Sequence, residues 1–144
     1  MIEARQLNRL TRYLNTDLVL TSPAALTALS AEFDHSCCVL YEQQDDDGNW
    51  HLSVESNATE NVAAADDIQK MLSVLAALSP AAKQQWDSCT QRDINIGFDC
   101  GDTWAYPHSL PHDALRMIVD AGCTLSLTLY PIRDEDEEAS RKEA

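Results

Sequence analysis

Two segments in the C-terminal half of the chain alternate strictly between apolar and polar residues, and this pattern constrains the fold more than any other feature. Residues 93–100 place Ile94, Ile96, Phe98 and Cys100 on one side and Asp93, Asn95, Gly97 and Asp99 on the other. Residues 123–130 repeat the pattern, with Leu125, Leu127 and Leu129 opposite Thr124, Ser126 and Thr128. Because successive side chains of a strand point to opposite faces, both segments predict strands of a sheet with one apolar and one polar face.

A hairpin and several amphipathic helices complete the predicted fold. Residues 37–42 and 50–55 flank a turn-prone acidic segment, and the second of these strands sets Trp50, Leu52 and Val54 against His51, Ser53 and Glu55. Apolar spacing and cap-and-proline signals predict helices over residues 3–14, 23–33, 66–78, 80–87 and 111–120, with a short extended piece at 17–20. The predicted class is α+β, a single antiparallel or mixed sheet of about four strands with helices packed on one face.

Length and charge narrow the classes of protein further. The 144 residues suit one domain, which we place at 1–132, followed by a charged, flexible tail at 133–144. The net charge is −14, and no Lys or Arg occurs between Tyr13 and Gln69. This charge repels nucleic acid and anionic membrane surfaces and attracts basic partners. No apolar run is longer than five residues, as at Cys37 to Tyr41, and the first ten residues carry no export signal, so we expect a cytoplasmic protein.

The five cysteines predict neither a disulfide framework nor a metal centre. Their number is odd, and Cys37 and Cys38 are adjacent, so reduced thiols are expected. The closest arrangement to a zinc site is Cys89, Cys100, His108 and His112, with gaps of 11, 8 and 4 residues and Pro111 between the histidines. We therefore expect no metal and no cofactor.

One catalytic arrangement can be drawn from these residues. Cys100 could act as a nucleophile with His108 or His112 as its base, oriented by Asp99 or Asp102. Cys100 falls on the apolar side of its strand, however, where a buried inert thiol is the commoner outcome. We therefore assign no catalytic residue and keep a small Cys/His hydrolase as an alternative.

The polar faces of the predicted strands suggest a surface that recognises another protein. The polar residues of segments 51–55, 93–99 and 124–128 are expected to line one surface, next to a loop that contains Trp104 and Tyr106. Aromatic side chains anchor interfaces, although these two could instead fold back over the edge of the core. The predicted partner-binding residues are Asp99, Asp102, Trp104 and Tyr106, with Glu55, Asp45, Asp46 and Asp47 as secondary contacts. Arg92, close to Trp86, is expected to form a structural salt bridge.

Three segments together resemble a known group of proteins. They are residues 18–26 (LVLTSPAAL), 86–98 (WDSCTQRDINIGF) and 123–131 (CTLSLTLYP). This arrangement is similar to small immunity-type proteins encoded beside bacterial polymorphic toxins of the Rhs, contact-dependent and type VI classes. The resemblance implies a non-enzymatic protein that binds a cognate toxin, here a basic one, and neutralises it by stoichiometric contact. A homo-oligomeric scaffold or regulatory subunit, joined through edge strands, is a further alternative.

Overall fold

The computed structural model describes residues 10–57 and 63–131, which form one mixed sheet and a layer of helices. The strands are β1 (Arg12–Ser22), β2 (Cys37–Gln44), β3 (Trp50–Ser56), β4 (Gln91–Asp99) and β5 (Thr124–Tyr130). The α-helices are α2 (Thr27–Phe33), α3 (Ala64–Leu72), α4 (Pro80–Ser88) and α5 (His112–Asp120), and a 3-10 turn, η1 (Ser73–Ala77), extends α3. The predicted α+β class is confirmed, with five strands rather than about four.

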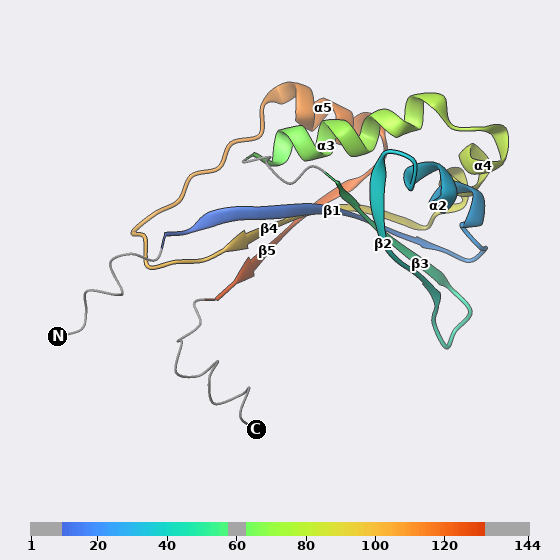
Figure 1. The fold of residues 1–144 in the computed structure, drawn as a ribbon, viewed down its shortest axis with the longest axis horizontal. Coiled ribbons are helices and arrows are strands. Elements are labelled where there is room, and N and C mark those ends of the chain that lie inside the picture. Colours follow the sequence, from blue (N-terminus) through green and yellow to red (C-terminus); the bar gives the residue numbers. More distant parts are fainter. Residues whose placement is uncertain (1–9, 58–62, 132–144) are drawn as a thin grey trace.

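The strand order is β2-β3-β1-β4-β5, with β4 and β5 parallel and the other neighbours antiparallel. The four described helices all lie on one side of this sheet, which we call the helical side (Figure 1). The opposite side, which no described helix covers, is called the open face. The two edge strands therefore come from the predicted hairpin and from the last alternating segment.

The central strand β1 is where the sequence-based prediction is wrong. A helix was expected over residues 3–14, but Arg12, Tyr13 and Leu14 belong to β1, and residues 3–9 lie outside the described part of the chain. The short extended piece predicted at 17–20 is the middle of this eleven-residue strand. Leu14, which gave the helical spacing, sits at a register shift between Tyr13 and Asn15 in the pairing with β4. This bulge turns Tyr13 toward Phe98 on the helical side.

The helical side is built from the apolar positions that the sequence predicted. Leu18 and Leu20 of β1, Leu52 and Val54 of β3, and Ile94 and Ile96 of β4 are buried against α2, α3 and α4, whose own buried residues include Leu29, Phe33, Ile68, Met71 and Trp86. The cap-and-proline signal at the start of α4 is confirmed, because Ser79 Oγ accepts the Ala82 N–H at 3.2 Å. At Ser22 the same signal misleads. Ser22 ends β1, and its Oγ accepts the Ala24 N–H in a turn before α2.

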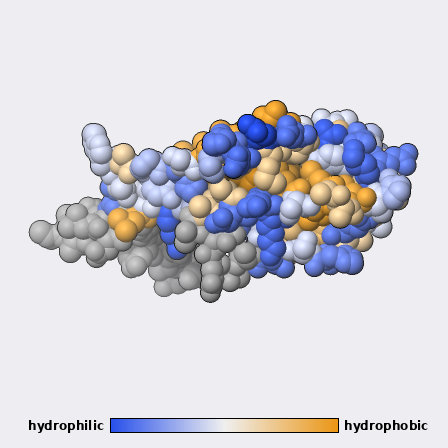
Figure 2. Space-filling model, turned by 90° about the horizontal axis from the view of Figure 1, so that it is seen from above, coloured by the Kyte–Doolittle hydropathy of each residue, from blue (hydrophilic) through white to orange (hydrophobic). Residues whose placement is uncertain are grey.

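The helical layer leaves the edge strand β5 partly uncovered. Leu125, Leu127 and Leu129 point to the helical side, in line with Ile94, Ile96 and Phe98 of β4, yet they are 42%, 62% and 64% exposed. Seen from above, onto the helices, hydrophobic residues reach the surface between hydrophilic ones (Figure 2). The helices therefore pack on the apolar face as predicted and leave this edge of it partly exposed.

Candidate interaction surface

The open face carries polar side chains from β3, β1, β4 and β5, of which Ser53 and Asp93 are buried. Strand pairing sets Glu55 of β3 beside Asp17 of β1, Asp17 beside Asn95 of β4, and Asn95 beside Ser126 of β5. One step along the sheet, Ser53, Val19, Asp93 and Thr124 form the next row. The strand pairing therefore puts the predicted polar residues on one face, and β1 runs through its middle.

Two carboxyl groups meet at the centre of the open face. Asp17 and Glu55 are directly opposite each other on neighbouring strands, an arrangement that is unfavourable when both are charged. Burial raises the pKa of Asp17 to about 6, with further contributions from the negative charge of Glu55 and from the hydrogen bond between the two groups. Asn15 donates from its Nδ2 to Glu55 Oε2 at 2.7 Å, which fixes Glu55 in place. Asp17 therefore keeps its proton to a higher pH than an ordinary aspartate does.

The β5 side of the open face holds its carboxylate differently. Asp93 Oδ1 accepts hydrogen bonds from Thr124 Oγ1 at 2.6 Å and Ser126 Oγ at 2.9 Å. Thr128 Oγ1 bonds Asn95 Oδ1 at 2.8 Å, which continues this ladder toward the next row. Asp93 is buried and accepts from two hydroxyl donors, so the hydroxyl groups of β5 serve the packing of the face.

An ion pair and a histidine contact mark the two ends of the open face. At one end Arg12 Nε lies 3.3 Å from Asp99 Oδ2. At the other end His51 Nε2 lies 2.7 Å from Asp45 Oδ2, at the tip of the β2–β3 hairpin. The hydrogen bond from His51 and those from the backbone of Asn49 and Asp47 lower the pKa of Asp45. Asp45 therefore closes the hairpin turn, while Asp46 and Asp47 are exposed at its tip.

The predicted partner-binding residues do not form one cluster. Asp99 pairs with Arg12, whereas His51, the contact of Asp45, pairs with Thr21, nine positions further along β1. At roughly 3.3 Å per residue this separation is about 30 Å. Glu55 lies between the two ends. The structure thus spreads Asp99 and Asp102 at one end, Glu55 in the middle and Asp45, Asp46 and Asp47 at the other.

The two loop aromatics have different environments. The Trp104 side chain is 99% exposed, in the loop that follows β4. Tyr106 instead packs edge-on against Phe98 and stacks with His108, which lies against Tyr13. Trp104 therefore remains a candidate anchor, while Tyr106 covers the end of the core.

The Cys/His catalytic alternative gains no support from the two histidines. His108 Nε2 accepts the N–H of Ala64 at 3.3 Å, and thus serves the first turn of α3, which has no side-chain cap of its own. The ring is also held between Tyr13 and Tyr106. His112 is exposed on α5, with Asp113 as its ionic contact. No group of three His, Cys, Asp or Glu side chains suited to a metal ion occurs within residues 10–57 and 63–131.

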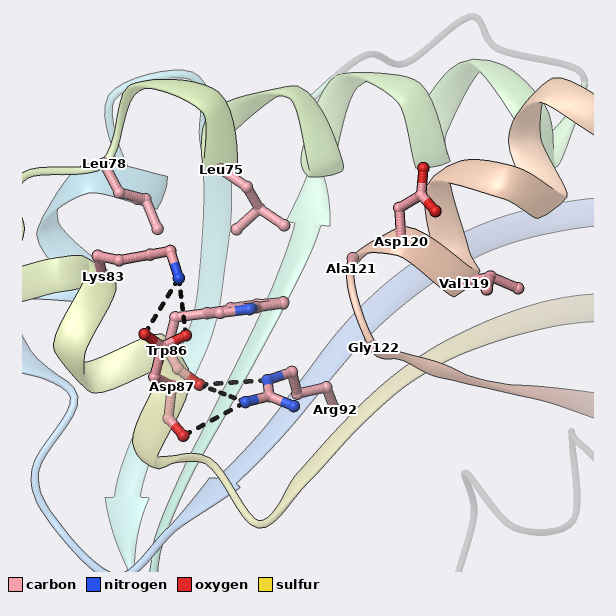
Figure 3. Close-up of a pocket in the computed structure, with 10 residues that line it drawn as sticks. All are labelled: Leu75, Leu78, Lys83, Trp86, Asp87, Arg92, Val119, Asp120, Ala121 and Gly122. Carbon is pink, nitrogen blue, oxygen red and sulfur yellow. Dashed lines mark hydrogen bonds and ion pairs between the residues drawn. The ribbon is translucent and has the colours of Figure 1, made fainter.

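A pocket of about 340 Å³ opens on the helical side between α4, η1 and the end of α5 (Figure 3). Arg92 lies 5.2 Å from the centre of the Trp86 ring and donates to the carbonyl of Trp86 at 3.1 and 2.9 Å and to that of Asp87 at 3.4 Å. The expected salt bridge is therefore replaced by a cap on the C-terminal end of α4. Lys83 pairs with Asp87 at 2.8 Å. The charged residues that line the pocket are two cations, Lys83 and Arg92, and two acids, Asp87 and Asp120.

Sequence reasoning missed Asp17 and Asn15, which hold the centre of the open face. Asn15 falls between the helix expected over 3–14 and the extended piece at 17–20, and that piece is too short to assign Asp17 to a face. The signal that could have found them is the alternation of Thr16, Leu18, Leu20 and Ser22 with Asn15, Asp17, Val19 and Thr21.

Comparison of the chain with protein-family models, with curated proteins and with solved structures gives no match. Within the described ranges, no helix combines the length and the apolar character needed to cross a bilayer.

Proposed function

We propose that this chain is a cytoplasmic immunity-type protein that binds a basic toxin domain through the open face of its sheet. The observation that carries the proposal is the charge of that face. Its strands place three partly exposed carboxyl groups there, those of Asp17, Glu55 and Asp99, against the guanidinium of Arg12. A fourth carboxyl group on this face, that of Asp93, is buried. An acidic surface of this kind steers a cationic partner and discriminates against anionic ones.

The central carboxyl pair favours a cationic contact from the partner. A Lys or Arg side chain placed over Asp17 and Glu55 would relieve the repulsion between them and lower the pKa of Asp17 from about 6. Binding would then release a proton from Asp17. The proposal therefore includes an affinity that increases as the pH rises from about 5 to 7.

The size of the open face suits a protein partner. Five strands about 4.8 Å apart span about 19 Å, and nine residues of β1 span about 30 Å, which gives a surface of roughly 600 Å². A stable interface uses about 800 Å² on each partner. The exposed indole of Trp104, beside the Asp99 end, supplies additional apolar contact.

The test uses the arrangement of genes that the resemblance implies. The protein encoded by the adjacent gene is expressed in bacteria with and without this chain, and growth is followed. The proposal predicts growth arrest by the neighbour alone, rescue by this chain, and a one-to-one complex that high salt weakens. A neighbour that is harmless, or that arrests growth without rescue, would contradict it.

Two variants of equal net charge locate the binding surface. Glu55→Gln with Asp99→Asn removes two charges from the open face, whereas Asp34→Asn with Asp120→Asn removes two exposed charges from the ends of α2 and α5. The first pair is expected to weaken rescue, and the second to leave it intact. Equal rescue by both pairs would show that another surface binds the toxin.

A further inference from the structure

The two edge strands of the sheet differ in how they are protected from pairing with another strand. Edge β2 has a register shift between Val39 and Tyr41, carries Glu42 and leads into the acidic hairpin tip. Bulges and charges are the usual devices that keep an edge strand single. Edge β5 has no charged residue and no proline over Thr124–Tyr130, and its pairing with β4 is regular.

The backbone of β5 presents a complete set of hydrogen-bonding groups at its outer edge. The carbonyl of Tyr130 accepts the N–H of Cys100 at 2.9 Å, so the backbone groups of Tyr130 face β4. Because these groups alternate along a strand, those of Thr128, Ser126 and Thr124 also face β4, and those of the three leucines face outward. Among the described residues, no strand pairs with this side of β5.

The sequence of β5 is nearly palindromic about Leu127. Read in either direction from Leu127, a hydroxyl residue is followed by a leucine, Ser126 and Leu125 on one side and Thr128 and Leu129 on the other. An antiparallel copy with Leu127 on the two-fold axis therefore sets leucine against leucine on the helical side. The same register sets hydroxyl against hydroxyl on the open face.

We infer that the occupant of this edge is β5 of a second copy of the chain. The register about Leu127 makes three hydrogen-bonded residue pairs, each exchanging two backbone bonds. It buries the half-exposed leucines, next to Leu115 and Val119, which reach the surface on α5, the helix that contacts β5. Two copies, each with a net charge of −14, meet here along a strand without charge, whereas a basic partner is attracted to the open face.

The proposed dimer is weak and strengthened by salt. A seven-residue strand is about 23 Å long, and the apolar strip beside it is narrow, so the interface falls at or below the lower end of the range for stable complexes. A dissociation constant on the order of 10 μM is expected. Salt screens the repulsion between two acidic copies, so it should favour the dimer, whereas it should weaken the toxin complex.

Sedimentation of the full chain across a concentration series from about 1 to 200 μM tests the inference. The wild type is expected to shift from 16.0 kDa toward twice this mass, and to do so at lower concentration in 0.5 M NaCl. Leu127→Lys should stay monomeric, because it places two ammonium groups on the axis. Leu40→Lys, at a 46% exposed position on edge β2, is the matched control and should dimerise as the wild type does.

A cysteine placed on the axis gives a second readout. Paired residues of this type have Cα atoms about 5.5 Å apart, which suits a disulfide. Under mild oxidation, Leu127→Cys is therefore expected to form a disulfide-linked dimer. Its yield should be well above that of the wild type, which has only the five native cysteines. A monomeric wild type at 200 μM, or no cross-link above background, would overturn the inference.

The test is separable from that of the proposed function. Leu127→Lys should still rescue growth, and the open-face pair of variants should still dimerise. If instead the isolated chain is monomeric and Leu127→Lys abolishes rescue, β5 pairs with a strand of the toxin, and the second-copy inference is wrong.

Discussion

The two sides of strand β1 differ in how their side chains are satisfied. Thr16, Leu18, Leu20 and Ser22 point to the helical side, where they are all buried. Asn15, Asp17, Val19 and Thr21 alternate with them and line the open face, half exposed. The apolar side is satisfied by the helices of the same chain. The other side holds the carboxyl group of Asp17, and in the proposed function it is this open face that meets the partner while the helical side maintains the fold.

The largest expected effect comes from breaking the helical side. Leu18→Ala removes a fully buried side chain between β1 and the helical layer and should lower the free energy of unfolding by about 2–5 kcal/mol. The adjacent Val19→Ala, on the open face, should cost less than about 1 kcal/mol. Urea titrations of both variants measure the difference. Equal losses would mean that the open face is packed as tightly as the core.

Arg92 is a charged residue on the helical side, and its guanidinium donates to backbone carbonyls at the end of α4. Its partner across the β1–β4 pairing is the buried Leu20. Arg92→Met keeps the apolar stem but leaves the carbonyls of Trp86 and Asp87 without their donor, and should cost about 2 kcal/mol. The measurement is the thermal midpoint together with the near-ultraviolet signal of Trp86. Restoration of the midpoint by Arg92→Lys would show that the cap needs only one donor, not the forked guanidinium.

Asp17 gives the smallest expected effect, and the size of that effect depends on pH. Its pKa is about 6 in the folded chain against an ordinary value of 3.8. Between these values the folded state binds more protons than the unfolded state, so stability falls as the pH rises from about 4 to 6.

Asp17→Asn removes this pH dependence. After allowance for solvent screening of a half-exposed group, the variant should be more stable than the wild type by about 1 kcal/mol at pH 7. At pH 4 the two should be nearly equal. Unfolding free energies measured from pH 4 to 7 decide this, and a difference that does not change with pH would contradict the assignment of the slope to Asp17.

Local patterns predicted most of the fold, and pairing between distant segments accounts for what they missed. The alternation at Ile94, Ile96 and Phe98 and the spacing of Ile68, Met71 and Leu72 place these side chains in the core, as observed. Leu14 extended an apparent helical spacing into β1 because its position at a bulge is set by β4, about eighty residues away in the sequence. A bulge created by a distant strand leaves no local signal.

The candidate surface was predictable in its character but not in its geometry. The polar faces of β3, β4 and β5 follow from alternation alone, and Glu55 was singled out correctly as one of their acids. The distance between Asp45 and Asp99 depends on register, which strand patterns do not specify. The role of Asp17 depends on its pairing with Glu55 and could not be derived before β1 was placed at the centre of the sheet.

The central claim is that the open face binds a basic partner. The most direct measurement is the affinity of the purified toxin for the wild type and for each of the two variants of equal charge. By titration calorimetry, Glu55→Gln with Asp99→Asn should bind at least about tenfold more weakly than the wild type, which is about 1.4 kcal/mol. Asp34→Asn with Asp120→Asn should bind within about twofold of the wild type. Equal weakening by both pairs would show that net charge, rather than the open face, determines binding, and would contradict the account.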